Sequence, residues 1–427
     1  MKRILVCFLL AILATTYSFA GYLENTVIVN TEDAKANGYD DSRKMVRDSQ
    51  GTLFYATRIK YENFYQIYVF KSLDEGMTWN TTNNGLPIAN VSGYHARVPS
   101  IAIDSQDRIH VIWYQGDSLN SGTNQRVIKY SQGYEQGNSW STWINIAEPA
   151  GYSEINEYWQ EHPVLCIGAL DQLYVAWEGR DINSPQDSDE QYMSQIFFSK
   201  SLDNGASWSS YQLIHAGLDS TQSRPAITVD HNGRLYVLMY SKQALAYPAI
   251  WLSQSTDDGA SWSSWGNVSN NDAFDNRHVS VTVNSKNHLH FVWRAIDKYH
   301  PNYTQIQYRR YVGGRLSPRR ILNTNKMIYN FNPSIGIDSH NQVHVVWCQT
   351  PEASGYPNEE PETGNIIYRR QQGKKWIVPV EVSTEENNTW PSLRWSPNFM
   401  NGGYLDITWE KSAESPYQIM HYSENLF

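Results

Sequence analysis

Val98-Pro-Ser-Ile-Ala-Ile-Asp104 and Ile109-His-Val-Ile-Trp-Tyr114 together form one copy of a pattern that recurs along the chain. An alternating strand leads into a turn rich in Asp, Ser, Asn and Gly, and a second strand then ends on an aromatic residue. The remaining copies are Arg43–Asp48 with Leu53–Ala56, Pro163–Gly168 with Leu173–Trp177, Pro225–Asp230 with Leu235–Tyr240, Val279–Asn284 with Leu289–Trp293, Pro333–Asp338 with Val343–Trp347, and Pro391–Trp395 with Tyr404–Trp409. A fixed period of this kind predicts a repeat architecture.

The spacing of the copies, about 53 to 65 residues, is enough for four short strands with their loops. A third strand follows each copy: Gln66–Lys71, Val127–Ser131, Gln195–Lys200, Ala249–Gln254, Gln305–Arg310, Asn365–Arg370 and Gln418–Ser423. Outside the N-terminus no stretch has a helical period. We therefore predict an all-β fold, a seven-bladed β-propeller with four-stranded blades, formed by residues 21–427 as a single domain.

The two ends of the mature chain predict how the ring closes. The chain ends at Phe427, directly after the third strand of the last blade, and Asn25–Asn30 forms a lone strand before the first blade. Pairing this strand onto the last blade would complete that blade, whereas an open array would leave two exposed sheet edges.

The first twenty residues have the composition of a secretory signal peptide. Met1-Lys2-Arg3 supplies positive charge, Ile4–Ala14 is apolar, and Ser18-Phe19-Ala20 is a small-residue cleavage site. The apolar stretch is too short to span a membrane, and no later segment is long enough. We expect residues 1–20 to be removed and the protein to be secreted or periplasmic, without a membrane span, and monomeric.

The composition indicates which classes of ligand the protein can bind. A formal charge of −9 and a pI near 5.7 exclude a nucleic-acid binder, which needs a basic surface. The 16 Trp and 29 Tyr suit β-sheets and surfaces that stack on sugars. After the signal peptide two cysteines remain, Cys166 and Cys348, which an exported protein can pair or leave free. No phosphate loop or tight metal-ligand spacing is found, so we predict no cofactor and no metal site.

Three blades carry an S-x-D-x-G-x-x-W turn after the third strand, at Ser72–Trp79, Ser201–Trp208 and Ser255–Trp262. The Asp accepts from nearby backbone amides, and the Gly supplies the positive φ that the turn needs. These turns resemble the Asp-box repeats of the sialidase superfamily. That resemblance implies a structural role at the blade periphery, so the acids of the turns are not expected to be catalytic.

Propellers bind ligands at the end of the central channel, where the inner strands begin. Polar and aromatic residues stand at these starts: Arg43, Arg97, His162, Arg224, Arg277 with His278, Asn332 and Trp390. Arginine grips a planar carboxylate with two parallel hydrogen bonds, so this set predicts binding of an anionic oligo- or polysaccharide. The alternative is that the arginines pair with acids such as Asp41, Asp275 and Glu161 and only tie the blades together.

Two resemblances imply catalytic residues. Arg97-Val98-Pro99 is similar to the Arg-Ile-Pro motif of sialidases, whose Arg holds the substrate carboxylate. Ala176-Trp-Glu178-Gly-Arg180-Asp181 resembles a sialidase first blade, which makes Arg180 a second carboxylate-binding arginine and Asp181 or Asp187 an acid. The chain departs from that family, because such sialidases have six blades, and their Tyr-Glu nucleophile pair has no clear counterpart here.

The seven-blade count is closer to that of polysaccharide lyases that cleave uronic-acid polymers, including ulvan lyases. Such enzymes need a base, an arginine that neutralises the carboxylate, and a group that assists the leaving oxygen. The candidates are His162 as base, Tyr240 as acid or base, and Arg224 or Arg277 as neutraliser. The sequence thus predicts an exported carbohydrate-active protein, a sialidase-like hydrolase or a uronic-acid lyase. A non-catalytic binding propeller and a structural role in the envelope remain as alternatives.

Overall fold

The structure is a computed structural model. It describes residues 25–426 except for residues 34, 39–42, 90–92, 117–125, 148–158, 189–190, 216–219, 243–244, 246, 270–272, 352–363, 384–386, 398–402 and 412–414. The predicted signal peptide lies outside the described residues. Within them, no helix has the length and apolar character that crossing a bilayer requires.

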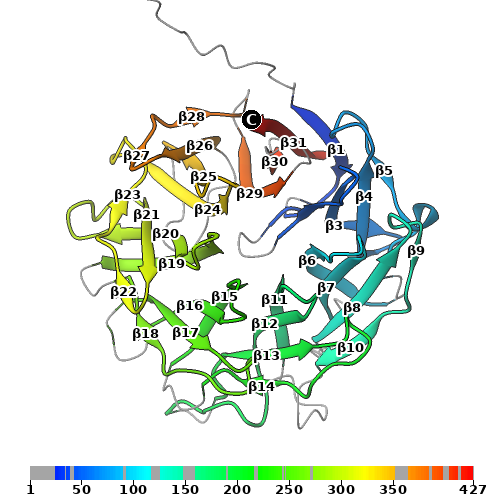
Figure 1. The fold of residues 1–427 in the computed structure, drawn as a ribbon, viewed down its shortest axis with the longest axis horizontal. Helices are drawn as coiled ribbons and strands as arrows, with labels where there is room; N and C mark the ends of the chain where they lie inside the picture. The colour runs from blue at the N-terminus through cyan, green and yellow to red at the C-terminus, as the bar shows by residue number, and fades with distance from the viewer. Residues whose placement is uncertain are drawn as a thin grey trace, which may run out of the picture.

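Seven antiparallel sheets are arranged radially around a central axis, as predicted (Figure 1). The inner strands are β2 (Met45–Arg47), β6 (His95–Ile103), β11 (Trp159–Ile167), β15 (Gln222–Val229), β19 (Ala273–Val283), β24 (Tyr329–Ile337) and β29 (Asn388–Pro397). The second strands are β3 (Leu53–Tyr61), β7 (Ile109–Gly116), β12 (Leu173–Arg180), β16 (Leu235–Ser241), β20 (Leu289–Asp297), β25 (Val343–Thr350) and β30 (Gly403–Lys411).

The third and outer strands complete each blade. The third strands are β4 (Phe64–Ser72), β8 (Val127–Tyr134), β13 (Gln195–Ser201), β17 (Ala249–Ser255), β21 (Gln305–Val312), β26 (Asn365–Gln372) and β31 (Tyr417–Leu426). The outer strands are β5 (Asn80–Thr81), β10 (Ile144–Ala147), β14 (Gln212–Leu213), β18 (Gly266–Asn267), β23 (Arg320–Ile321), β28 (Val380–Glu381) and β1 (Thr26–Thr31). Short pairings at hairpin ends add β9 (Ser139–Trp140), β22 (Arg315–Leu316) and β27 (Lys375–Trp376), and η1 (Asn83–Gly85) is a single 3₁₀ turn.

The ring closes between the two ends of the chain. Strand β1 pairs antiparallel with β31, from Thr26 opposite His421 to Thr31 opposite Tyr417. The N-terminal strand thus supplies the fourth strand of the last blade, and the edge of that blade is covered. The predicted closure is confirmed.

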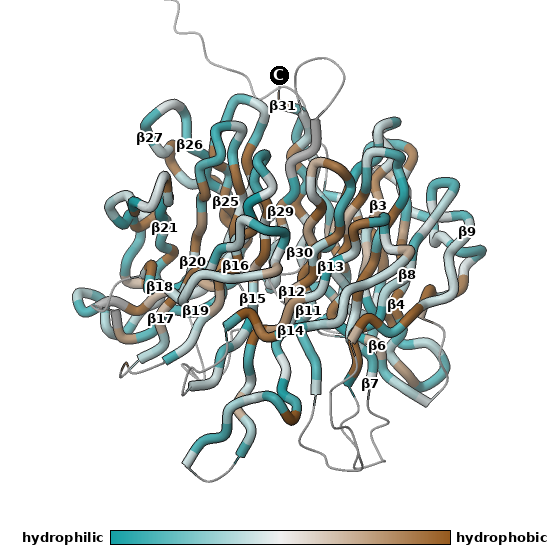
Figure 2. The backbone as a smooth tube through the Cα atoms, turned by 60° about the horizontal axis from the view of Figure 1, so that its bottom comes forward, coloured by the Kyte–Doolittle hydropathy of each residue, from teal (hydrophilic) through white to brown (hydrophobic). Residues whose placement is uncertain are grey.

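The core lies between adjacent blades. Five second strands each contribute a fully buried tryptophan: Trp113, Trp177, Trp293, Trp347 and Trp409. The backbone tube is most apolar along the strands and most polar at the turns (Figure 2). Burial of a large aromatic side chain removes about 150–250 Å² from water, so these residues dominate the packing of the ring.

The two cysteines are separate. Cys166 in β11 and Cys348 in β25 are both buried, and they form no disulfide with each other. The pairing that the sequence left open is not formed.

The S-x-D-x-G-x-x-W turns hold neighbouring blades together. In the turn of the third blade, the Asp203 carboxylate accepts from the Ser207 amide at 2.8 Å and from the Ser201 hydroxyl at 2.8 Å. Gly205 has φ +86°, and a Cβ there would lie 2.0 Å from the hydroxyl oxygen of Tyr130 in the preceding blade. The acid is used within its own turn and the glycine packs against the preceding blade, which is a structural role.

Candidate functional site

Six inner strands carry the same bulge close to their start. One residue in each has a φ near +50°: Val98, His162, Arg224, His278, Asn332 and Trp390. Proline follows in every case except His278, and the pairing with the second strand shifts at this point. Positive φ at residues other than glycine costs about 1–3 kcal/mol and is concentrated at functional sites. A bulge also re-aims the side chains around it.

The bulges lie at one end of the ring, which we call the entry face: the end where inner strands begin and second strands end. At this end, one residue of each second strand directly follows the buried segment of that strand. These residues, which we call the second-strand ring, are Arg58, Tyr114, Glu178, Tyr240, Arg294, Cys348 and Glu410. All seven have side chains capable of acid–base or ionic chemistry, in a part of the strand where apolar residues dominate.

His162 and Glu178 form the centre of the candidate site. The imidazole Nδ1 lies 2.6 Å from Oε1 of Glu178, and both side chains are buried. The backbone amide of Arg224, at the bulge of the next blade, donates to Oε2 of Glu178 at 2.5 Å. Two adjacent blades are therefore joined through one carboxylate, which also fixes the orientation of the imidazole.

A second carboxylate flanks this pair. Glu161 forms an ion pair with Arg126, and its Oε2 lies 3.5 Å from Nδ1 of His162. The ring of Tyr114 packs edge-on against His162 at 6.2 Å. Ligand atoms of Glu161, His162 and Glu178 lie within 4.8 Å of one another, which is a metal-like arrangement. Arg126 already forms an ion pair with Glu161, and the Arg224 amide already donates a hydrogen bond to Glu178.

Tyr240 stands on the neighbouring blade among cationic side chains. The Arg277 guanidinium lies 5.7 Å from the centre of its ring, and the imidazole of His278 lies 6.1 Å away. Arg277 is held by Asp275 at 2.8 Å, and Arg294 contacts the same carboxylate at 3.5 Å. The pairing of Arg277 with Asp275 that the sequence offered as an alternative is therefore present.

The electrostatics divide the site into a neutral base, an anion and a neutral acid. Burial, reinforced by the charge of Arg224, lowers the pKa of His162 to about 4. Burial opposes ionisation of Glu178, but His162 and Arg224 outweigh it and hold its pKa below the ordinary value. Burial raises the pKa of Tyr240, the Glu178 charge adds to this, and the nearby arginines reduce it. At neutral pH His162 is uncharged, Glu178 is ionised and Tyr240 keeps its proton.

A cleft opens beside Arg277 on the entry face. It has a volume of about 600 Å³, and its lining includes Tyr247, Phe274, Tyr329 and Lys242. Tyr247 and Phe274 pack edge-on at 5.4 Å and are each more than a third exposed. Exposed aromatic faces beside cationic side chains match the two surfaces of an acidic sugar, an apolar ring face and an anionic group.

Other residues predicted for the site lie elsewhere on the entry face. Arg97 is in no ion pair with the residues that the structure describes, and its guanidinium faces the ring of Tyr65 at 5.7 Å. Arg180 donates to the Tyr192 carbonyl at 3.2 Å. Trp390 is buried in the last blade, where its carbonyl accepts from Asn37.

The Asp181 carboxylate is used by structural hydrogen bonds within its own blade. Its oxygens accept from the Asn183 amide and the Tyr211 hydroxyl, both at 2.8 Å, and it is fully buried. It contacts none of His162, Glu178 or Tyr240. Asp187, the other acid considered there, is exposed, and Asp41 lies outside the described residues.

Arg43 belongs to a different level of the channel. The first hairpin turns of the two blades, at Asp48 and Asp104, are equivalent. Counted from these turns, Arg43 stands two positions nearer to its turn than Arg97 does. It therefore does not join Arg224 and Arg277, and it lines a cavity deeper in the ring. Sequence alignment by strand start placed it too close to the entry face.

Sequence reasoning missed Glu178, Tyr114 and Arg294 as site residues. A signal for them exists, since each directly follows the last residue of the strong β-pattern in its second strand, Trp177, Trp113 and Trp293. Comparison of that one position across all blades would have revealed the second-strand ring. The long-range partners that select among its members are not visible in the sequence.

Comparisons with known proteins agree with the fold. An ulvan lyase, solved with a -[GlcA(1-4)Rha3S]- ligand, matches with a TM-score of 0.58 at 9% identity, over 92% of this chain and 94% of that one. An α-L-arabinanase of Penicillium chrysogenum matches with a TM-score of 0.52 at 14% identity, over 77% of this chain and 92% of that one. A Hadza microbial sialidase matches with a TM-score of 0.50 at 12% identity, over 84% of this chain and 74% of that one.

No protein-family model matches the sequence, and no curated protein matches it. At such low identity the structural matches establish the propeller fold and its occurrence among lyases, arabinanases and sialidases. The function has to be argued from the site.

Proposed function

We propose that this protein is a polysaccharide lyase that cleaves an anionic, uronic-acid-containing glycan by β-elimination. The observation that carries the proposal is the His162–Glu178 pair, joined to Arg224, beside a protonated Tyr240 surrounded by arginines. A neutral base, a neutral acid and cations for a carboxylate are the three requirements of this reaction.

In the proposed step, His162 removes the proton on the carbon next to the uronic carboxylate. Donation of the Nδ1 proton to Glu178 makes Nε2 the basic nitrogen of the imidazole. The C–H electron pair forms a carbon–carbon double bond, and the bond to the glycosidic oxygen on the neighbouring carbon breaks. That oxygen takes the proton of the Tyr240 hydroxyl. His162 then gives its proton to solvent, and solvent protonates Tyr240 again. No oxidant or cofactor is consumed.

Arg224 and Arg277 are assigned to the substrate carboxylate. Abstraction of the proton places negative charge on that carboxylate, and cations fixed beforehand stabilise it without reorganisation. The charges of both arginines act on Tyr240, so they lie around the reacting region. The aromatic cleft beside Arg277 is assigned to an adjoining sugar.

A glycoside hydrolase fits the same residues less well. Hydrolysis needs a protonated carboxylic acid to activate the leaving oxygen, and its pKa is usually raised. Glu178 has the opposite property, because its pKa is lowered. Asp181, the acid implied by the sialidase resemblance, is used by hydrogen bonds to Asn183 and Tyr211 of its own blade. A non-catalytic binding protein would need no neutral base aimed by a carboxylate.

The structural neighbours support this choice in one respect. The ulvan lyase that shares the propeller fold is described with a glycan containing GlcA, a uronic acid, and a sulfated sugar. We extend the class of substrate, an acidic polysaccharide, to this chain.

The test is a screen against uronic-acid polysaccharides with and without sulfate. β-Elimination leaves a conjugated double bond in the product, and its absorbance at about 235 nm rises as proton abstraction proceeds. We expect wild-type protein to produce this rise and His162→Gln to abolish it. His340→Gln, a change at an exposed histidine of a hairpin turn, is the matched control and should retain full activity. Release of reducing ends without the absorbance would instead identify a hydrolase, and binding without cleavage would identify a binding protein.

Export is part of the proposal. Met1-Lys2-Arg3, the apolar stretch after it and the small residues at Ser18–Ala20 support removal of residues 1–20. The mass of the protein recovered outside the cytoplasm should match a chain that begins at Gly21, and an intact Met1 terminus would contradict this.

A further inference from the structure

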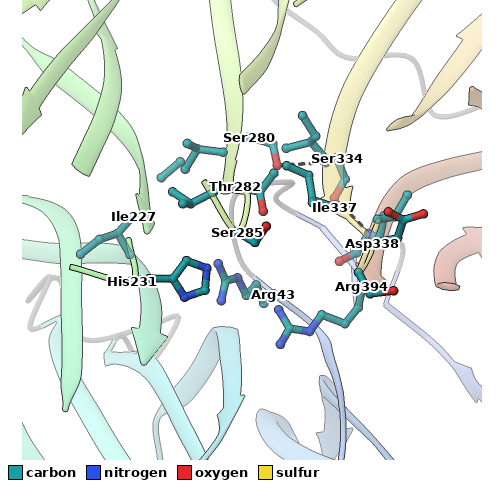
Figure 3. Close-up of a pocket in the computed structure, with 18 residues that line it drawn as sticks. Arg43, Ile227, His231, Ser280, Thr282, Ser285, Ser334, Ile337, Asp338 and Arg394 are labelled. Atoms are coloured by element: carbon teal, nitrogen blue, oxygen red, sulfur yellow. Dashed lines mark hydrogen bonds between the residues drawn. The ribbon is translucent and has the colours of Figure 1, made fainter. Parts of the chain in front are cut away.

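A cavity of about 330 Å³ lies in the central channel, away from the entry face. Its wall is formed by the halves of the inner strands that lead away from the entry face and by the hairpin turns that follow them. Arg43 and Arg394 project into it from adjacent blades, and Figure 3 shows their guanidinium groups side by side, with His231, Thr282 and Ser285 around the same space. The cavity is large enough for a small polyatomic ion and water.

The two arginines carry like charges in a desolvated place. Burial lowers the pKa of Arg43. Burial and the charge of Arg43 together lower the pKa of Arg394 to about 10. A guanidinium group keeps its proton in proteins at neutral pH, so two positive charges face one another inside the ring. Such an arrangement is costly unless an anion compensates it.

The described part of the chain supplies no acid for this pair. Neither arginine forms an ion pair with a described residue, and Nε of Arg394 has no hydrogen-bond partner there. Asp406 is the acid whose charge reaches Arg394, but its carboxylate is bound by Arg47 at 2.9 Å, by His421 at 3.1 Å and by Ser423 at 2.8 Å.

Asp338, the acid in the cavity wall, is similarly occupied. Its carboxylate accepts from the backbone amides of His340 and Gln342 at 2.9 and 2.7 Å, and it lies 3.3 Å from Nε2 of His344. Both described carboxylates near the cavity are therefore used by other groups, and no described acid offsets the positive charge of the arginine pair.

Hydroxyl groups extend the set of donors. The Ser280 oxygen accepts from the Ile335 amide at 3.3 Å, and the Ser334 oxygen accepts from the Leu393 amide at 3.0 Å. An oxygen that accepts from a backbone amide keeps its own proton to donate. Both serines line the cavity, Ser280 on β19 and Ser334 on β24.

We propose that the channel cavity binds a small inorganic oxyanion, phosphate or sulfate, between Arg43 and Arg394. Guanidinium groups bind tetrahedral oxyanions through paired N–H donors, and serine hydroxyls complete the shell. The bound anion would link the first blade, which carries Arg43, to the last, which carries Arg394. The site thus reinforces the ring next to its closure, and it is independent of the proposed lyase activity.

The experiment is thermal unfolding of the mature protein in phosphate, in sulfate and in chloride at matched ionic strength. A ligand that binds only the folded state raises Tm as its concentration rises above Kd. We expect saturable rises with phosphate or sulfate beyond the effect of chloride. A rise with only one of the two would identify the anion. Equal effects of all three salts would overturn the proposal.

Variants localise the effect. Arg394→Gln and Arg43→Gln should each lose the anion-specific rise in Tm. In chloride, each variant should show a smaller fall in Tm than a variant that removes an arginine from an ion pair, because the repulsion between the two like charges is relieved. Arg310→Gln, an exposed arginine on β21, is the control and should respond as wild type does. An undiminished response in both cavity variants would contradict the assignment. Calorimetric titration of wild-type protein with phosphate and sulfate tests binding even if a variant fails to fold, and absence of binding heat at millimolar anion would again overturn it.

Discussion

Glu178 and Glu410 occupy the same position in two blades and behave in opposite ways. Each follows a fully buried tryptophan near the end of its second strand, and each is itself buried. Glu178 meets His162 and the Arg224 amide, and its pKa is lowered. Glu410 accepts from the backbone amide of Asn37 at 3.2 Å, and burial raises its pKa to about 8.

The difference shows that the repeat supplies a position and the neighbouring loops supply its chemistry. Glu410 is covered by the N-terminal segment that precedes the first blade, where Asn37 also binds the Tyr55 hydroxyl and the Trp390 carbonyl. That carboxyl group is sealed inside a structural network. Glu178 faces a histidine and an arginine that stand on bulges, so it can orient a base.

The largest expected effect comes from removing the partners that distinguish Glu178. His162→Gln and Tyr240→Phe should each lower turnover by about 10³-fold, because each removes a proton-transfer group. Initial rates of absorbance increase on an acidic polysaccharide measure this. Tyr134→Phe, at an exposed tyrosine, should have no effect. Activity within a fewfold of wild type in either of the first two variants would remove that residue from the mechanism.

A smaller effect is expected from the glutamates themselves. Glu178→Gln should reduce kcat by about 10²-fold, because the imidazole loses the acceptor that fixes its tautomer. Glu410→Gln should leave kcat unchanged. Equal losses in the two variants would mean that both glutamates act only on stability, and the distinction drawn between them would fail.

The pH profile separates orientation from structural damage. A neutral His162 is required, so activity should fall as pH decreases through its pKa of about 4 and should persist through neutral pH until Tyr240 ionises. The Glu178 charge raises the pKa of His162, so Glu178→Gln should move the acid limb to lower pH. A variant that is merely less stable would keep the limb in place.

The smallest effect concerns stability in alkali. The pKa of Glu410 is higher in the folded state than in the unfolded chain, so its contribution favours folding below the unfolded value of about 4.5 and is lost as pH rises through about 8. Glu410→Gln should therefore raise Tm at about pH 9 and change it little at about pH 5. Thermal unfolding at the two pH values checks this, and a Tm gain of equal size at both would point to a cause other than ionisation.

The sequence predicted the ring itself because the propeller repeats a local pattern. The alternating strands around Ile109 and Val343, and the lone strand at Asn25–Asn30, determined the blade count and the closure. Register within the inner strand was harder, since Arg43, Arg97 and Arg224 occupy three different positions relative to the bulge. Partners such as Glu178 and Arg126 are set by contacts between blades, which local periodicity does not encode.

The central claim is that bond cleavage proceeds by elimination at the His162–Tyr240 site. The most direct measurement is mass spectrometry of the products from one defined acidic oligosaccharide, with wild type and Tyr240→Phe compared at equal protein concentration. Elimination predicts that the two fragment masses sum to the substrate mass, with an unsaturated uronic residue, and that Tyr240→Phe forms both fragments about 10³-fold more slowly. Fragments whose masses sum to the substrate plus one water would show hydrolysis and contradict the account.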